Sequence, residues 1–477
     1  MVGAQPARET IGGETIDLAD VQGNILRGYH KARVRHLSVQ VVDAQKARGW
    51  LKATLSPGAA FPQITIASHW GQHPPDVCFN LGVTFTGLKA LGVPGSTADS
   101  FPEAFREGMA ARSQYVGDWD NSAPSNWQAW FQDANALHLV LTLHANTVEL
   151  LDQAEAAIAS GAGQAFRILG RNEGYQFAGD RVHFGYRDSI SQPRFFKSQA
   201  FDDQPIAPLG TVLLGYKTAM EQLRWSLPDP PVLGLNGAFN AFRVLEQDVA
   251  GFEAFLDRAA DQLMKSSAAN ELLPPGSEQK ILPGGTRLEA MREVVAAKVT
   301  GRWRNGTPIT LWPHDANPDP SSVTANNFDY SEDADGLKCP FGAHIRRTNP
   351  RSAKIVQRVS NHTRRIVRRG FPYGPAFDRT HPDSIERGLL GNFLCANLAA
   401  QYEAIQYDWI NLGLQDPRIT GTNDPLLGAN EGDVGVFDIL TGSGPVRIRG
   451  FSRFVRTRGG AYTFLPSISA MRWIASL

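Results

Sequence analysis

The stretch HLVLTLHANTVELLDQAEAAIAS, residues 138–160, predicts a β-strand that is followed at once by a helix. Before it, LSVQVV (37–42) has the composition of another strand. The pattern restarts in the second half of the chain, where GAFNAFRVLEQD (237–248) predicts a strand and GFEAFLDRAADQLMK (251–265) predicts a helix. Strands and helices are therefore interleaved in both halves. This predicts an α+β fold and is compatible with a divergent duplication of one α+β unit.

Further segments of the C-terminal half carry a secondary-structure signal. EAMREVVAAKVTGRW (289–303) and NLAAQYEAIQYDWINLGL (397–414) have the composition of helices. VRIRGFSRFVRTRGGAYTFLPS (446–467) alternates like two paired strands around a Gly-Gly turn. Residues 312–336 form a long turn-rich stretch, and loops of this length are usually functional or disordered.

The length of 477 residues is too great for one typical domain and predicts two or three. We expect residues 1–20 to be a flexible lead-in, and the Pro-rich region 200–236 to end in a linker. The expected domains are therefore an N-terminal one over 21–210 and a C-terminal one over 211–477.

The net charge and the cysteine content limit the partners and the cellular compartment that we expect of this protein. Lys and Arg together number 47, as do Asp and Glu, so the net charge is zero. This balance argues against nucleic acid or a membrane surface as a partner. The three cysteines form no CxxC pair, and the N-terminus shows no signal-peptide pattern. Both observations lead us to expect a cytoplasmic protein with reduced thiols.

Common enzyme signatures are missing from the chain. GxGxxG, GxxxxGK[ST], HExxH and GxSxG do not occur, which weakens dinucleotide, nucleotide, zinc-protease and serine-hydrolase interpretations. One unusual segment is HFGYRDSISQP (183–193), in which Asp188 stands among turn-forming residues. An Asp in such a turn most often bonds its own backbone.

Two arginine-rich segments point to an anionic ligand. In KCPFGAHIRRTNPR (338–351), His344 is followed by three arginines, and cations beside an imidazole disfavour its protonated form. In NHTRRIVRRGFPYG (361–374), four arginines fall close together and the segment ends in a rigid turn. Guanidinium forks in such a cluster suit carboxylates or phosphates.

In this order, these segments resemble dye-decolorizing peroxidases, a haem protein family, and most closely its longer members with extended loops. The resemblance covers nearly the whole chain, from DVQGNILRGY (20–29) to GGAYTFLPSISAMRWIAS (459–476). Between these ends lie, in family order, LLGYKT, RVLEQDVAGFEAF, GRWRNGTPITL, NNFDY, CPFGAHIRRTNPR, RRIVRRGFPYG and QYEAIQ. Each motif alone is weak, but together they are specific.

The resemblance assigns roles residue by residue. The family's GxxDG motif makes Asp188 the distal acid–base residue and places Ser189 where the family has its final glycine. The GAHIRR motif makes His344 the proximal ligand of the haem iron, and the RIxRRG motif makes Arg365 the distal arginine. The NPR element places Arg351 near a haem propionate.

The resemblance also implies a carboxylate behind the proximal histidine and a lining for the distal pocket. The carboxylate corresponds to Asp424 in the NDPLLG segment, with Glu431 as the alternative. The family's GLLF stretch reads GLLGNFLC (388–395) here, which assigns Phe393 or Leu394 to the distal pocket.

The implied fold is two ferredoxin-like α+β domains of the dimeric α+β barrel type, with antiparallel sheets flanked by helices. The implied function is that of a haem b peroxidase, which reduces hydrogen peroxide and oxidises dyes, phenols or similar one-electron donors through a ferryl intermediate. A homo-oligomer is compatible with the resemblance. Two alternatives stay open: a haem carrier or sensor with weak peroxidase activity, and an anion-binding protein built on the arginines of 361–374.

The serine after Asp188 allows two backbone states. If its backbone is left-handed, Ser189 carries strain of roughly 1–3 kcal/mol. If its backbone is ordinary, the Ser189 hydroxyl is available to bond the Asp188 carboxylate. We expect the ordinary backbone, because every other element of the site pattern is retained.

Overall fold

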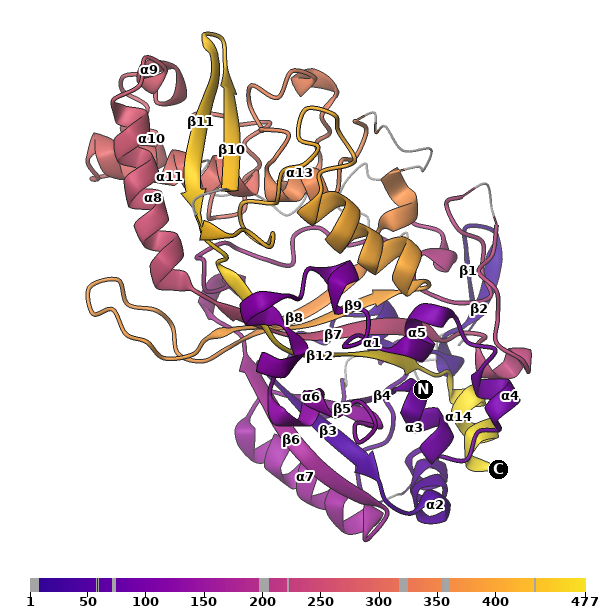
Figure 1. Cartoon of the computed structure of the whole chain (residues 1–477). Coiled ribbons are helices and arrows are strands. Elements are labelled where there is room, and N and C mark those ends of the chain that lie inside the picture. The colour runs from indigo at the N-terminus through magenta and orange to yellow at the C-terminus, as the bar shows by residue number, and fades with distance from the viewer. Residues whose placement is uncertain are drawn as a thin grey trace, which may run out of the picture.

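The centre of the fold is one antiparallel sheet of eight strands in the order β6-β3-β5-β4-β12-β7-β9-β8 (Figure 1). The computed structural model describes residues 8–56, 58, 60–70, 74–196, 206–220, 223–316, 325–353, 355, 361–432 and 435–477. The strands of the sheet are β3 (Arg33–Val41), β4 (Cys78–Val83), β5 (Leu139–Ala145), β6 (Phe166–Tyr175), β7 (Ala238–Gln247), β8 (Val367–Tyr373), β9 (Gly388–Cys395) and β12 (Val455–Leu465).

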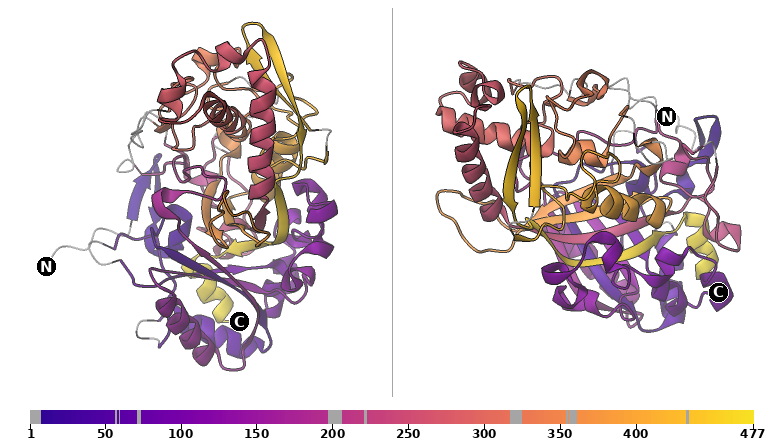
Figure 2. Two further views of the ribbon diagram at one scale, coloured as in Figure 1. Left: turned by 90° about the vertical axis from the view of Figure 1, so that its left-hand side faces the viewer. Right: turned by 45° about the horizontal axis from the view of Figure 1, so that its top comes forward.

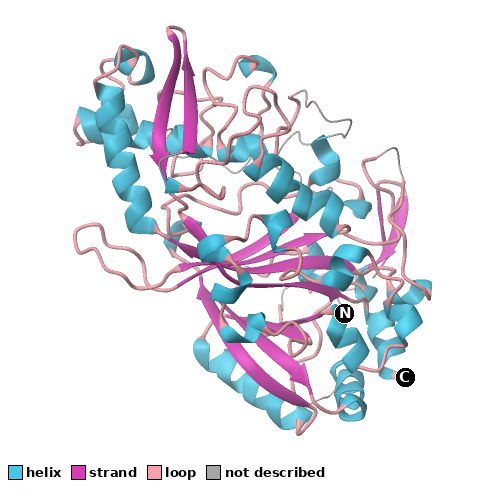
Figure 3. Ribbon diagram, in the orientation of Figure 1, coloured by secondary structure: helices cyan, strands magenta, loops and turns pink. Residues whose placement is uncertain are grey.

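The two halves of this sheet have the same connectivity. In the first half the chain runs β3, α2 (Ala44–Thr54), β4, β5, α7 (Val148–Ala162) and β6. In the second half it runs β7, α8 (Val249–Met264), α11 (Arg287–Thr300), β8, β9, a helical segment and β12. Each half places its first strand in the middle, beside its third and fourth strands. The prediction of two ferredoxin-like α+β units is therefore confirmed (Figure 3).

Strand β12 joins the two halves into one sheet. It pairs with β7 along its length and with β4 at Val83 and Phe464. The outer strands β6 and β8 also contact each other, and the Tyr175 hydroxyl donates to the Gly374 carbonyl at 2.8 Å. The last helix, α14 (Ile468–Ala475), packs against α2 of the first half. The end of the chain thus belongs to the core of both halves.

The remaining elements lie around this sheet (Figure 2). Two hairpins are formed by β1 (Arg8–Ile11) with β2 (Glu14–Asp17) and by β10 (Gly435–Thr441) with β11 (Gly444–Phe451). The short helices are α1 (Gly23–Leu26), α3 (Phe85–Ala90), α4 (Gly95–Ala98), α5 (Glu103–Glu107), α6 (Ala129–Gln132), α9 (Ala269–Leu272), α10 (Glu278–Ile281) and α13 (His344–Thr348). The predicted helix over 397–414 is confirmed, with π-helical turns at η11 (Leu398–Glu403) and η12 (Ile405–Asn411).

A second layer stands on the C-terminal half of the sheet, in the upper part of Figure 1. Helices α8 and α11 pack together there, and β11 packs against α8. Helix α11 begins at a capping box, in which Thr286 and Glu289 satisfy each other's backbone N–H groups. The candidate site lies where this layer meets β7, β8 and β9.

Two predictions about connecting segments are wrong in the described residues. The expected lead-in over 1–20 is ordered from Arg8 on, because Ile16 in the first hairpin and Leu18 directly after it are completely buried. The linker expected at the end of 200–236 is packed, because Leu233 in it is completely buried in an apolar cluster. Residues 1–7, 200–205 and 317–324 of the predicted loop regions lie outside the described residues.

The predicted Gly-Gly turn is also wrong, since Gly459 and Gly460 lie inside β12. Strand β11 pairs with β10 instead of β12. A Cβ atom on Gly459 would lie 2.3 Å from Cδ2 of Phe131, and one on Gly460 would lie 2.4 Å from Sδ of Met109. Glycine is therefore required here by side chains that pack directly on the strand, and not by a change of chain direction.

The three cysteines, Cys78, Cys339 and Cys395, are all buried and free, as the sequence predicts. In the part of the chain that the structure describes, no helix is both long enough and apolar enough to cross a bilayer.

Two histidines buried in the sheet give the fold a predicted sensitivity to acid. His36 on β3 and His144 on β5 are completely buried, and burial lowers the pKa of each from 6.5 to about 3. Between these values the unfolded chain binds protons that the folded chain does not. The free energy of unfolding should therefore fall as the pH drops from about 6.5 towards 3, by on the order of 1 kcal/mol per pH unit for each histidine.

Urea denaturation between pH 7 and pH 4 measures this slope. The double variant His36→Gln, His144→Gln should show a flatter dependence than the wild type. His381→Gln is the matched control, because the His381 side chain is 86% exposed. Equal slopes in all three proteins would contradict the assignment of the acid sensitivity to the two buried histidines.

Candidate active site

A cavity of about 280 Å³ lies between the sheet and the second layer. It brings together five residues that the sequence singled out: Asp188, His344, Arg351, Arg365 and Phe393. Most of its other walls are apolar side chains, among them Leu245, Leu389, Ile405, Ile410, Leu426, Leu427 and Val455. A cavity of this kind, largely apolar with a few polar groups, is typical of a small-molecule or cofactor site.

His344 and Asp424 form a fixed pair at the wall of this cavity. His344 begins α13, directly after the Cys-Pro-Phe-Gly turn, and its Nδ1 lies 3.0 Å from Oδ2 of Asp424. The other carboxylate oxygen accepts from the backbone N–H groups of Leu426 and Leu427 at 2.8 and 2.9 Å. Since Asp424 occupies Nδ1, the nitrogen of His344 left for a ligand is Nε2.

The electrostatics of this pair favour an ionised carboxylate. Asp424 is completely buried, and burial by itself acts to raise its pKa. The charge of His344, the hydrogen bond from it and the charge of Arg347 together outweigh burial and hold the pKa of Asp424 below its usual value. The alternative assignment to Glu431 is wrong, because Glu431 is exposed and accepts from Trp119 Nε1 at 3.3 Å.

The three arginines that follow His344 in its motif make different contacts. Arg346 forms a buried ion pair with Asp333 at 2.8 Å, and Arg347 donates to the Gly342 carbonyl at 3.0 Å. Both therefore hold the turn before α13 and do not line the cavity. Of these three arginines, Arg351 is the one that lines the cavity, and its guanidinium donates to the Asn326 and Phe328 carbonyls.

The arginine that the structure places on Asp188 is Arg368, three residues after the predicted Arg365. Nη1 of Arg368 lies 3.4 Å from Oδ1 of Asp188, and its Nη2 donates to the Ser191 carbonyl at 3.1 Å. Arg365 also lines the cavity, but its Nη2 donates to the Gln192 carbonyl at 3.3 Å. The prediction that Arg365 is the distal partner of Asp188 is therefore corrected to Arg368.

Strand alternation explains why Arg368 faces the cavity, which Arg365 reaches from the segment before the strand. Arg368 is the second residue of β8, and successive side chains of a strand point to opposite faces. Val367 and Arg369 point away from the cavity: Val367 is buried in an apolar cluster, and Arg369 donates to the Asn24 carbonyl. The four arginines of 361–374 thus do not all share one surface: Arg364, Arg365 and Arg368 line the cavity, and Arg369 does not. Arg364 is also paired with Asp408 at 2.8 Å.

The Gln192 side chain hydrogen-bonds both backbone polar groups of Arg368. Its Oε1 accepts from the Arg368 N–H at 3.0 Å, and its Nε2 donates to the Arg368 carbonyl at 2.9 Å. The Gln192 side chain thereby makes the two hydrogen bonds that a neighbouring strand would make at this edge of the sheet. Sequence reasoning missed both Gln192 and the role of Arg368. The alternation of β8 was the signal for Arg368, whereas Gln192 carries no local signal.

Register also separates the two candidates for the distal lining. Phe393 is the direct partner of Arg368 across β8 and β9, so both side chains share the cavity face. Leu394 is the partner of Val367 and is completely buried in the cluster on the other face. The assignment of Leu394 to the pocket is therefore wrong, whereas Phe393 lies in it.

Ser189 has a left-handed backbone, with φ of 63°. The expectation of an ordinary backbone is thus wrong. The side chain is exposed and forms no hydrogen bond with any of the residues that the structure describes. The departure from glycine therefore stores strain without adding a contact to Asp188.

Replacing Ser189 by glycine should relieve this strain. We expect Ser189→Gly to raise the free energy of unfolding by about 1 kcal/mol, because glycine adopts positive φ without a Cβ penalty. Ser189→Ala is the matched control and should give no gain, since alanine keeps the Cβ atom. Urea denaturation measures both. A gain of equal size in the two variants would show that the hydroxyl, and not the backbone, is the source of the strain.

The residues around the cavity fit a flat apolar macrocycle that carries a metal and acidic groups. The apolar side chains would cover its faces, Nε2 of His344 is a nitrogen ligand, and Arg351 and Arg365 are donors for carboxylates. Within the described ranges, no group of three or more His, Cys, Asp or Glu side chains is arranged to hold a metal ion. The donor set thus suits haem, as the resemblance implies.

Comparisons with known proteins show which family the chain resembles. A family model described as the DyP dimeric alpha+beta barrel domain matches residues 20–176, which contain the first half of the sheet. A dye-decolorizing peroxidase of Exidia glandulosa is 30% identical over 98% of this chain and 89% of its own length. A multifunctional dye peroxidase of an Amycolatopsis species is 28% identical over 96% of both chains.

Solved structures show the same similarity in three dimensions. The structure of a dye-decolorizing peroxidase in complex with 2,6-dimethoxyphenol has a TM-score of 0.78 and 30% identity. It covers 96% of this chain and 100% of its own. A fungal DyP-type peroxidase of Auricularia auricula-judae has a TM-score of 0.79 at 27% identity, with 97% and 100% covered.

Proposed function

Because the chain belongs to the dye-decolorizing peroxidase family, which consists of haem-dependent enzymes that use hydrogen peroxide, we propose that the cavity at His344 binds haem b and is the active site. The observation that carries this proposal is the pair of His344 and Asp424. A histidine whose Nδ1 is held by a buried carboxylate is oriented and made more electron-donating as a metal ligand. The same cavity contains an acid–base candidate and an arginine, Asp188 and Arg368.

We assign the binding of the cofactor to residues from three segments. Nε2 of His344 would ligate the iron, with Asp424 fixing the ring. Arg351 and Arg365 would pair with the propionates, since both line the cavity and a guanidinium suits a carboxylate. Phe393 and the aliphatic side chains would exclude water from the macrocycle. When bound, haem supplies the iron at which the O–O bond of peroxide is cleaved and through which donors are oxidised by one electron at a time.

Asp188 would move the proton of the peroxide. Its carboxylate would accept one proton of the peroxide and return it to the oxygen that leaves as water. Arg368, whose guanidinium faces the same carboxylate, donates hydrogen bonds to the oxygen on which negative charge develops. Gln192 keeps Arg368 on the cavity face through both of its backbone bonds.

We propose dyes and phenols as the electron donors. The support is the family itself and the related peroxidase whose structure contains 2,6-dimethoxyphenol. Electrons are donated in single steps, so the products are radicals that react further in solution.

A spectrum of the purified protein tests this proposal. Protein expressed with haem supplementation should show a Soret band, and peroxide with 2,6-dimethoxyphenol should give steady coloured product. A Soret band without peroxide-dependent oxidation would instead support a haem carrier or sensor. A protein that binds no haem under these conditions would contradict the proposed site.

A further inference from the structure

Arg304 holds the loop that carries Asp188. Its Nη1 donates to the Phe184 carbonyl at 2.8 Å, and its own carbonyl accepts from the Arg187 N–H at 2.9 Å. Its guanidinium lies 5.6 Å from the centre of the Tyr186 ring. Arg304 thus hydrogen-bonds the main chain at Phe184 and at Arg187, both within the four residues before Asp188.

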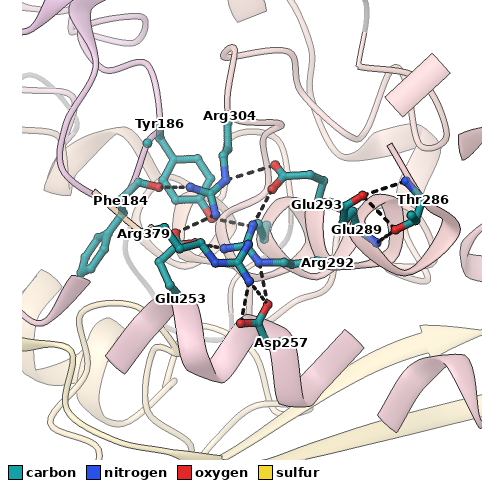
Figure 4. A network of polar contacts seen from close by, with 12 residues as sticks. Phe184, Tyr186, Glu253, Asp257, Thr286, Glu289, Arg292, Glu293, Arg304 and Arg379 are labelled. Carbon is teal, nitrogen blue, oxygen red and sulfur yellow. Dashed lines mark hydrogen bonds and ion pairs between the residues drawn. The ribbon is translucent and has the colours of Figure 1, made fainter. Parts of the chain in front are cut away.

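Arg304 is in turn fixed by carboxylates on two long helices, as Figure 4 shows. Its Nη2 lies 3.1 Å from Glu253 of α8, and its Nε lies 3.1 Å from Glu293 of α11. Arg292 bridges the same two carboxylates and also pairs with Asp257. The side chains of Arg304, Glu253, Glu293 and Arg292 are all less than a fifth exposed. Ion pairs shielded in this way restrict the guanidinium more than exposed pairs do.

Gly185 provides the space for this contact. Its φ is 84°, and a Cβ atom on it would lie 2.5 Å from Nη1 of Arg304. The glycine that opens the GYRDS segment is therefore matched to the guanidinium that lies against it.

Asp188 needs such support because its own side chain is weakly held. The carboxylate is one-third exposed, and its contact with Arg368 is 3.4 Å long. At that length the ion pair contributes little to holding the carboxylate in place. The position of Asp188 is set mainly by its backbone, which bonds the Asp180 carbonyl at 2.9 Å.

We propose that Arg304 is a positioning residue, which fixes the main chain of 184–187 so that the Asp188 carboxylate faces Arg368. This inference rests on the proposed acid–base role of Asp188. Arg304 does not line the cavity, so any effect on the reaction passes through the loop. It is thus a link between the rigid pair of α8 and α11 and the acid–base group.

Arg304→Lys tests the proposal. Lysine keeps one positive charge for Glu253 and Glu293 but loses the guanidinium fork that reaches Phe184. We expect the peroxide-dependent change in haem absorption to slow roughly 10- to 100-fold, the effect of a displacement of about 1 Å. Haem content and melting temperature should stay near those of the wild type.

Hydrogen exchange gives a second readout that does not depend on turnover. Peptides covering 182–191 should exchange faster in Arg304→Lys, with haem bound or absent. Arg379→Ala is the matched control: Arg379 pairs with Asp257 in the same network, is 52% exposed and, within the described structure, has no hydrogen bond to the loop. It should show wild-type exchange and rate. Unchanged exchange and rate in Arg304→Lys would overturn the proposal.

A double-mutant cycle separates a positioning role from general destabilisation. If Arg304 acts through Asp188, then Asp188→Asn with Arg304→Lys should be no slower than Asp188→Asn alone. If the rate losses of the two single variants instead multiply in the double variant, the inference is overturned while the proposed function stays intact. An Asp188→Asn variant as fast as the wild type would instead overturn the acid–base role and the inference together. Gly185→Ala, which displaces the guanidinium by a Cβ atom, should reproduce the rate loss independently.

Discussion

Replacement of His344 by alanine should abolish stable haem binding and with it peroxide turnover. The imidazole that we propose as the haem ligand is oriented by a buried carboxylate, and its removal leaves Asp424 facing an empty position. We expect the Soret band of the purified variant to be lost or strongly weakened. Free imidazole should restore part of it, because the shortened side chain leaves room for a small ligand in the cavity. The readouts are the haem content per chain and the absorption spectrum with and without imidazole.

His381→Ala is the control for this variant, since that histidine is exposed and its ring contacts only its near neighbours Asp378 and Thr380 among the described residues. It should bind haem as the wild type does. Asp424→Asn should lie between the two: the ring is still present, but a neutral amide polarises it less. A His344→Ala protein with an unchanged Soret band and full turnover would show that another residue is the ligand.

Asp188→Asn should slow the reaction with peroxide by about 10²- to 10⁴-fold, the usual contribution of general acid–base catalysis. Asparagine has nearly the same shape as aspartate but does not accept and return the proton. Arg368→Leu should cost about 10²- to 10³-fold, as removal of a donor to a developing negative charge does. Stopped-flow measurement of the change in haem absorption after mixing with peroxide gives both rates.

Arg365→Leu distinguishes the two neighbouring arginines. Arg365 bonds the Gln192 carbonyl and lines the cavity, so its loss should weaken haem retention more than it slows the peroxide reaction. Arg368→Leu should do the reverse. If Arg365→Leu were the slower of the two with its haem content intact, the placement of Arg368 as the partner of Asp188 would be contradicted.

The sequence predicted the fold well where one periodicity dominates a segment. The strands over 37–42 and 237–248 and the helix over 251–265 follow from composition and spacing, and all three are present. The prediction failed at Gly459 and Gly460, because a glycine pair has the same appearance in a turn as in a strand on which other side chains pack. The contacts with Phe131 and Met109 that decide between the two come from distant segments.

The site was predictable in its residues but not in all of their roles. His344, Asp424 and Asp188 stand in motifs that the resemblance identifies, and the structure pairs His344 with Asp424 and brings His344 and Asp188 to one cavity. The motif does not distinguish Arg365 from Arg368, because both side chains line the cavity. Only the folded chain shows that Arg368 lies against Asp188, on the face that it shares with Phe393. The positive φ of Ser189 depends on the whole loop and cannot be predicted from the residue type.

The pairing of β12 with the earlier strands β4 and β7 has a consequence for the synthesis of this protein on the ribosome. Val83 and Phe464 lie near opposite ends of the chain, yet they are direct neighbours in the sheet. During synthesis Val83 lacks this partner until translation is almost finished, although Thr65 and Gln22 already bond the same edge of β4 at Phe79 and Leu81. The edge of β7 that β12 covers along its whole length stays open for just as long. An open edge of this kind invites wrong pairing and aggregation, and distant pairings form slowly. A nascent chain arrested before β12 should therefore depend on chaperones that shield strand edges.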